Sequence, residues 1–129
     1  MLSHDSQVAP LIEIFELYML RDASLADQRE DDGGEHCSRV GRLVELLALK
    51  MGYGESTSQT LGLAARLHDI GKLATPDVLL LKRCRLTPME LTIVRRHTIE
   101  GSQILTDIIG TLERCSGVLV TAESIRLAA

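Results

Sequence analysis

The chain has 129 residues, of which 45% are apolar and 25% charged, and its formal net charge is −4. This length fits one small folded domain. With no basic run and only three aromatic residues, the sequence excludes a phosphate-facing patch or a base-stacking platform for a nucleic-acid polymer. Three widely spaced cysteines are typical of reduced thiols in an intracellular protein.

The N-terminal part predicts a helix and then a loop. Apolar residues recur at helical spacing from Pro10 to about Leu20. The stretch "LIEIFELYML" carries two glutamates and is too short to span a membrane, and no signal peptide precedes it, so we expect a cytoplasmic protein without membrane contact. The acidic "RDASLADQREDDGGEH" that follows predicts a loop or frayed helix end whose charges mostly face solvent.

Further helices are predicted along the rest of the chain. The second runs from about Glu35 to Met51, with apolar residues such as Leu43 and Leu47 along one face. The third begins near Ser56, in a sequence that resembles a capping box, and ends in "HDIGK".

Two more helices, with a further apolar pattern through Ile104, Leu105 and Ile108 between them, complete the pattern. Thr87, Pro88 and Glu90 have the spacing of an N-cap, a first helical position and a capping box. The last segment, "VLVTAESIRLAA", is also predicted to be helical. We find no strand alternation and no internal repeat, so the predicted fold class is all-α.

A histidine and an aspartate adjoin where the third helix is predicted to end. Neighbours on a regular helix point about 100° apart, but at a helix terminus adjacent side chains can converge on one point. Imidazole nitrogen and carboxylate oxygen are suitable donors for Mn²⁺, Fe²⁺, Ni²⁺ or Zn²⁺. The alternative is that His68 bonds a backbone carbonyl while Asp69 caps a turn, and the dipeptide alone does not decide between the two.

The positions of the other histidines favour a metal site. His36, His68 and His97 all fall near the ends of predicted helices, and Asp32 precedes His36 by four positions. Histidines and carboxylates brought together from separate helices are a usual way for a helical bundle to hold metal. His4 is given no role.

Two stretches of the sequence, taken together, resemble a known family. "GGEHCSRVGRLVELLALKMG" and "LAARLHDIGKLATPDVLLLKRCRLTPMELTIVRRHTIEGSQIL" are similar to the front half of an HD-GYP domain, a branch of the HD superfamily of metal-dependent phosphohydrolases. The resemblance covers roughly residues 31–109. It implies an HD-domain helical bundle, with residues 1–30 as an N-terminal helix and acidic linker and residues 31–129 as the N-terminal part of the domain.

The resemblance also implies a site and an activity. Two or three metal ions, commonly iron or manganese, activate a water, and the substrate is cyclic di-GMP, opened to pGpG or cleaved on to GMP. Lys72 would contact a substrate phosphate or the attacking hydroxide, and Asp69 would share the catalytic role. Gly71 and Gly101 are expected to permit close backbone approach, and an ordinary turn would explain Gly71 almost as well. The implied metal ligands are Asp32 (where the family usually has glutamate), His36, His68, Asp69 and His97.

The sequence departs from the family pattern at its end. "LVTAESIRLAA" matches the helix that leads into the family's "HHE" and "GYP" motifs, and the chain stops at Ala129 before them. We therefore expect a metal site short of ligands, impaired activity, exposed apolar helix faces and a tendency to self-associate.

Three functions are consistent with these patterns. The first is an HD-GYP-type cyclic di-GMP phosphodiesterase, weakened in this chain. The others are a catalytically inactive regulatory or protein-interaction module, and another HD-family hydrolase acting on nucleotides. The expected partner is a cyclic dinucleotide or nucleotide substrate, and a homodimer or a signalling-protein partner is left open.

Overall fold

The computed structural model describes residues 4–30, 33 and 35–116, and within these every regular element is a helix, as the sequence predicts. Asp32 and the helix predicted in "VLVTAESIRLAA" lie outside the described residues. None of the described helices is both long and apolar enough to cross a membrane. The elements are α1 (His4–Asp27), α2 (His36–Lys50), α3 (Glu55–Arg66), the 3₁₀ helix η1 (Ile70–Ala74), α4 (Asp77–Leu80), α5 (Pro88–Arg95) and α6 (His97–Ser116).

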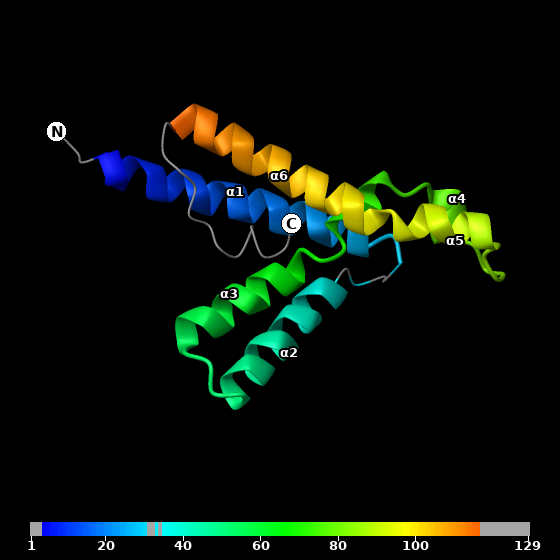
Figure 1. Ribbon diagram of the computed structural model, residues 1–129, viewed down its shortest axis with the longest axis horizontal. Helices are drawn as coiled ribbons and strands as arrows, with labels where there is room; N and C mark the ends of the chain where they lie inside the picture. The colour runs from blue at the N-terminus through cyan, green and yellow to red at the C-terminus, as the bar shows by residue number, and fades with distance from the viewer. Residues whose placement is uncertain (1–3, 31–32, 34, 117–129) are drawn as a thin grey trace.

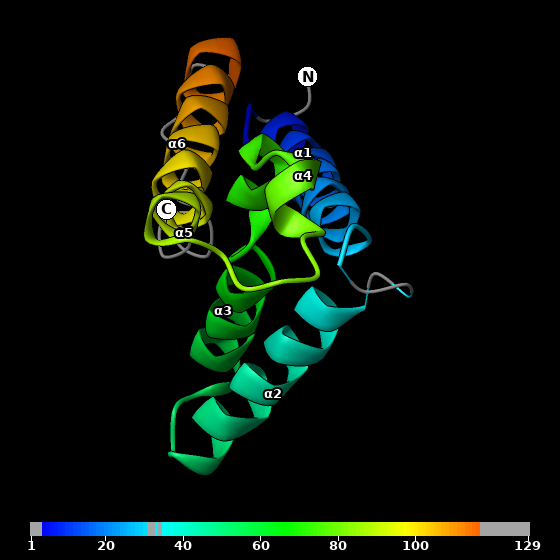
Figure 2. The same ribbon diagram turned by 90° about the vertical axis from the view of Figure 1, so that its right-hand side faces the viewer.

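The core lies where α1 and α6 pack on either side of the segment that contains η1 (Figure 1; Figure 2). Ile70 at the start of η1 and Leu67 before it are almost fully buried. α2 and α3 form an antiparallel hairpin that projects from this core (Figure 1). The "HDIGK" segment therefore occupies the centre of the fold, where the hairpin meets the other helices. The clustered core residues are Met19, Ala23, Leu67, Ile70, Leu105 and Ile109.

Helix α1 extends through Asp27, so of the loop or frayed helix end predicted for the acidic stretch, residues 21–27 form the end of the helix. Ala23 and Ala26 are 1% and 0% exposed. Alanine has the highest helix propensity and lets helices approach closely, so these small residues continue the helix against η1. The charged residues on either side of this pair, Arg21, Asp22 and Asp27, made the stretch look like a solvated loop.

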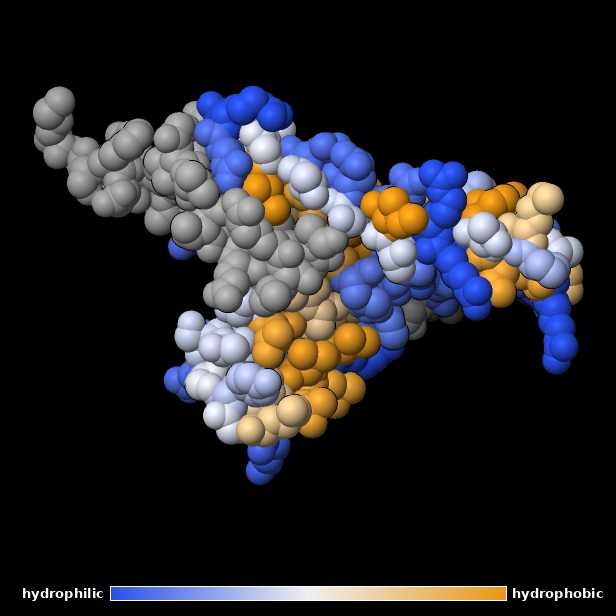
Figure 3. Space-filling view, viewed as in Figure 1, coloured by the Kyte–Doolittle hydropathy of each residue, from blue (hydrophilic) through white to orange (hydrophobic). Residues whose placement is uncertain are grey.

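Helices α2 and α3 pack through small residues. A Cβ on Gly41 would lie 2.7 Å from the carbonyl oxygen of Gly62, so glycine is required for this close crossing. The predicted apolar face of α2 does not make the contact: Leu43 and Leu47 are 67% and 60% exposed. Apolar surface is visible over this hairpin (Figure 3), which confirms the expectation of exposed apolar helix faces.

The two predicted capping boxes differ in outcome. At α5 the Thr87 hydroxyl accepts the Glu90 N–H, and the Glu90 carboxylate accepts the Thr87 N–H, so this capping box is confirmed. The one predicted at Ser56 is wrong, because α3 begins a residue earlier, at Glu55, with Gly54 as N-cap and no side-chain hydrogen bond.

Candidate metal centre

Asp69 is the central residue of the candidate site. It follows the end of α3 and precedes η1, and its side chain is only 7% exposed. The neighbouring apolar residues Leu67 and Ile70 are anchored in the core, and this anchoring fixes the short polar segment between them. A carboxylate held this firmly in a buried position needs positive partners.

His68, in the turn after α3, and His97, at the start of α6, both approach Asp69. The Nε2 atom of His68 lies 3.2 Å from Oδ2 of Asp69, and Nε2 of His97 lies 3.5 Å from Oδ1. Each ring donates its Nδ1–H to a carbonyl oxygen one turn earlier, at 2.8 Å for Ala65 and 2.7 Å for Val94. Because a carbonyl can only accept, the proton of a neutral ring stays on Nδ1 and Nε2 keeps its lone pair for a metal.

His36, at the start of α2, completes the cluster. Its ring centroid lies 5.5 Å from that of His68, and His36, His68 and Asp69 each offer a donor atom within 4.8 Å of the others. Two imidazoles and a carboxylate are a donor set that divalent transition metals accept. The cluster of His36, His68 and Asp69 can therefore hold a metal ion. Among the described residues, His97 approaches Asp69 but is not part of this set of three.

Lys72 adds positive charge at Oδ2 of Asp69, the oxygen that His68 also contacts. Its Nζ lies 2.8 Å from Oδ2 of Asp69 and 2.5 Å from Oε2 of Glu30. Burial alone would raise the pKa of Asp69, but the hydrogen bonds from His68 and Lys72 outweigh burial and hold that pKa well below its usual range. Burial would lower the pKa of Lys72, but Asp69 and Glu30 reverse this and raise it. Both groups therefore stay ionised.

The electrostatic environment of His68 favours its protonated form while no metal is bound. The hydrogen bond with Asp69, helped by one with Cys37, raises the pKa of His68 from 6.5 to about 10. A metal ion must displace the proton on Nε2 before it can bind there. Metal binding at this site is therefore linked to proton release.

The end of α1 supports the site through residues that sequence analysis had treated as solvated. Buried Asp27 accepts the backbone N–H of Cys37 at 2.8 Å, which satisfies one of the free donors at the start of α2 next to His36. Arg29 donates to the carbonyl oxygens of Lys72 and Thr75, at 2.6 and 2.5 Å, and pairs with Asp77. These contacts join residues far apart in sequence, and no local pattern indicates them.

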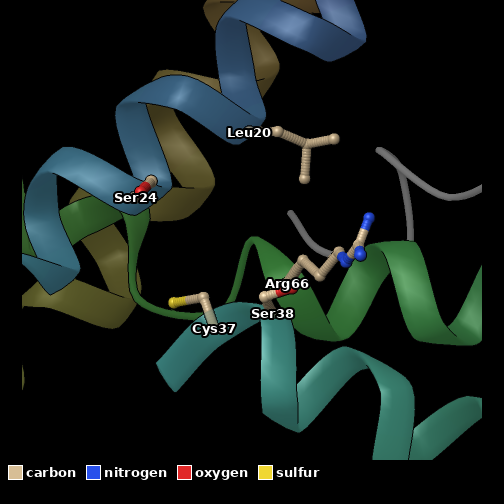
Figure 4. A pocket seen from close by; sticks show the side chains of 5 residues that line it. All are labelled: Leu20, Ser24, Cys37, Ser38 and Arg66. Atoms are coloured by element: carbon tan, nitrogen blue, oxygen red, sulfur yellow. The ribbon is translucent and has the colours of Figure 1, made fainter. Parts of the chain in front are cut away.

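Two cavities flank the start of α2. One, of about 340 Å³, is lined by Asp27, Glu30, His36, Arg39 and Lys72, and so opens beside the candidate metal centre. The other, of about 230 Å³, lies between α1, α2 and α3 and is lined by Leu20, Ser24, Cys37, Ser38 and Arg66 (Figure 4). Of these two cavities, the first has a residue of the cluster, His36, in its wall.

Comparison with known proteins identifies similar chains. The family model described as "HD domain" matches residues 33–126. A cyclic di-GMP phosphodiesterase of Thermotoga maritima is 38% identical over 74% of this chain and 25% of its own length. A probable cyclic di-GMP phosphodiesterase of Vibrio cholerae is 33% identical over 81% of this chain and 26% of its own. A 3'3'-cGAMP-specific phosphodiesterase of the same organism is 36% identical over 64% of this chain and 16% of its own.

These matches confirm the resemblance inferred from "LHDIGK" and its surroundings. The chain spans about a quarter of the length of the first two curated relatives. The similarity to enzymes named for cyclic dinucleotides is therefore confined to one part of each of them.

Proposed function

We propose that this chain, which belongs to the HD domain family, supplies the metal-binding part of a phosphodiesterase that hydrolyses cyclic dinucleotides. The observation that carries the proposal is the convergence of His36, His68 and Asp69 beside Lys72. The similarity to relatives named cyclic di-GMP phosphodiesterase supports cyclic di-GMP as the substrate, with pGpG or GMP as the product.

The proposed metal ligands are grouped around Asp69. Iron or manganese is the proposed ion, because both metals bind imidazole nitrogen and carboxylate oxygen. When bound, divalent ions would supply the positive charge and the activated water that phosphodiester hydrolysis needs. The hydrogen bonds from Nδ1 of His68 and His97 to backbone carbonyls orient both Nε2 atoms towards Asp69. The ligands are His36, His68, Asp69 and His97, with Asp32 as a further carboxylate beyond the described residues.

Lys72 is the proposed catalytic residue that contacts the substrate phosphate. Its side chain is 18% exposed, so its charge is less screened by water than that of a surface lysine. It stays protonated because Asp69 and Glu30 raise its pKa. Asp69 has two roles in this proposal, since it binds the metal and holds Lys72 next to it.

The organisation of the chain is part of the same proposal. Residues 31–129 would form the N-terminal part of an HD-GYP-like domain, and residues 1–30 its N-terminal helix and acidic linker. A cyclic dinucleotide is an intracellular messenger, so the protein would act in the cytoplasm.

An activity assay tests the proposal. The purified protein is incubated with cyclic di-GMP and either manganese or ferrous iron, and the products are separated by chromatography. We expect slow, metal-dependent formation of pGpG that is lost in Asp69→Asn and retained in His4→Ala. Cyclic GMP-AMP belongs in the same assay, because two relatives are named for that substrate. Cleavage of other nucleotides alone would favour another HD hydrolase, and metal binding without turnover would favour a regulatory module.

A further inference from the structure

The cavity between α1, α2 and α3 carries a positive charge in its wall. Its volume is about 230 Å³, and it shares none of its described lining residues with the cavity beside the metal centre. One water molecule takes up about 30 Å³ of the liquid, so a small ion fits here. The described part of the wall contains one cation, Arg66, and no carboxylate. The cavity is therefore locally basic, although the formal net charge of the chain is −4.

Arg66 is not engaged by the protein itself. It is the last residue of α3 and is partly buried, and its guanidinium forms no hydrogen bond or ion pair within the described residues. This group carries five N–H donors and stays protonated at any ordinary pH. A charge that is partly removed from water without a partner costs free energy. An anion in the cavity would supply the missing acceptor.

The stem of Arg66 is held in place by its packing on α2. A Cβ built on Gly41 would collide with Cγ of Arg66 and lie 3.2 Å from its Cδ. The side chain therefore crosses α2 at a residue that has no side chain of its own. Because this contact restricts the rotamers of Arg66 beforehand, less conformational entropy is lost when the guanidinium binds a ligand.

Ser38 provides a second donor from α2. It comes three residues before Gly41, and residues three apart lie on one face of a helix. Figure 4 shows Ser38 and Arg66 at the α2–α3 side of the cavity, with Leu20 and Ser24 of α1 across from them. The Ser38 hydroxyl, like the Arg66 guanidinium, has no hydrogen-bond partner in the part of the chain that the structure describes.

These two donors favour phosphate over carboxylate. The fork of a guanidinium binds two oxygens of one anion side by side. A carboxylate then has no further oxygen, whereas a phosphate monoester has a third terminal oxygen for a donor on another helix. Arg66 on α3 and Ser38 on α2 together match the phosphate.

We propose that this cavity binds a phosphate monoester or inorganic phosphate, with Arg66 as the charged ligand and Ser38 as the second donor. Neither residue belongs to the metal cluster, and the two cavities have different described walls. The inference therefore goes beyond the proposed function and does not depend on it.

An NMR titration of the metal-free protein tests this inference. The ¹⁵N-labelled protein is kept in a chelator at constant ionic strength, and the amide signals of Ser38, Gly41 and Arg66 are followed. The probes are inorganic phosphate and guanosine 5′-monophosphate, with acetate and uncharged guanosine for comparison. Arg66→Gln, which retains most of the stem, is compared with the matched control Arg42→Gln. Arg42 is an exposed arginine of α2 that is not among the residues lining the cavity.

We expect saturable shifts of these amides with phosphate and with guanosine 5′-monophosphate, and much weaker ones with acetate or guanosine. Arg66→Gln should weaken phosphate binding by about ten- to a hundred-fold, because a charged hydrogen-bonding partner is lost, and Ser38→Ala by about two- to tenfold. Arg42→Gln should bind like the unmodified protein. Tighter binding of the nucleotide than of inorganic phosphate would support a nucleotide as the ligand, and equal binding would support phosphate alone.

Three results would overturn the inference. The first is the absence of saturable shifts at these amides with either phosphate probe. The second is equal affinity in Arg66→Gln and Arg42→Gln, and the third is binding of acetate as tight as that of phosphate. Unchanged affinity in Ser38→Ala would overturn the role of Ser38. Because no metal is present, these outcomes leave the proposed function to its own assay.

Discussion

Gly71 packs directly against the backbone carbonyl of His97. A Cβ built on Gly71 would collide with that carbonyl oxygen and with the backbone nitrogen of Gly101. The start of α6 therefore approaches η1 more closely than any other residue type at position 71 would allow. This contact confirms the close backbone approach expected at both glycines, and it sets the separation between Asp69 and His97.

Substitution of Gly71 by alanine should therefore affect both the fold and the site. Because the obstructing atoms are backbone, they cannot move aside cheaply, and we expect Gly71→Ala to lower the free energy of unfolding by about 3 kcal/mol. Chemical denaturation measures the effect. The matched control is Gly54→Ala, where a Cβ meets nothing within 4 Å and the expected change is below about 1 kcal/mol. Equal stability of the two variants would contradict the packing described here.

Arg29 should be important for stability although it lies in an acidic, loop-like stretch of sequence. Its guanidinium joins the turn after α1 to the carbonyl oxygens of Lys72 and Thr75 and to Asp77. We expect Arg29→Ala to cost about 2–4 kcal/mol in denaturant unfolding, because two partly buried carbonyls lose a charged donor.

Lysine is the informative second substitution at position 29. A single ammonium cannot reproduce the planar fork of the guanidinium, so Arg29→Lys should recover less than half of the loss. If the unfolding free energy of Arg29→Ala lies within about 0.5 kcal/mol of that of the unmodified protein, as for an ordinary surface site, the contacts of Arg29 contribute little to stability.

The metal-free protein should lose stability as the pH rises. The pKa of His68 is raised from 6.5 to about 10 in the folded state, chiefly by the hydrogen bond with Asp69. Since folding favours the proton, the stabilisation is complete below the unfolded pKa of 6.5 and disappears as the pH passes through the folded pKa of about 10.

Urea unfolding in the presence of a chelator, at several pH values, tests this dependence. The difference in stability between the unmodified protein and His68→Gln should shrink as the pH increases from about 6 to about 10. His4→Gln serves as the control and should follow the unmodified protein throughout. A difference that stays constant with pH would mean that the proton on His68 does not contribute to folding.

The sequence predicted the helical fold and the convergence of the site because the relevant signals are local. Apolar periodicity marks the helices, and the capping box of Thr87 and Glu90 lies within four residues. His36, His68 and His97 fall at helix ends, where a chain can direct polar side chains towards a common centre. The α1 boundary was misjudged because Ala23 and Ala26 carry little hydrophobic signal among charged neighbours.

Other parts of the site could not be predicted because their partners are distant in sequence or are backbone atoms. Asp27 accepts a hydrogen bond from the N–H of Cys37, ten residues away. Arg29 donates hydrogen bonds to carbonyl oxygens more than forty residues away. Every residue type carries the same backbone carbonyl group, so no sequence pattern indicates which carbonyl a distant side chain will contact. Arg39 resembles any exposed helical arginine until the fold places it beside Lys72 in one cavity.

We expect a divalent cation to bind the cluster of His36, His68 and Asp69, in which Asp69 is buried, His36 partly buried and His68 exposed. A crystal structure of the protein grown with excess manganese, with anomalous data, tests it most directly. We predict an anomalous peak about 2 Å from Nε2 of His68 and from an oxygen of Asp69, with His36 and His97 around it. Well-ordered imidazoles without such a peak, bonded only to backbone carbonyls and to Asp69, would contradict the claim.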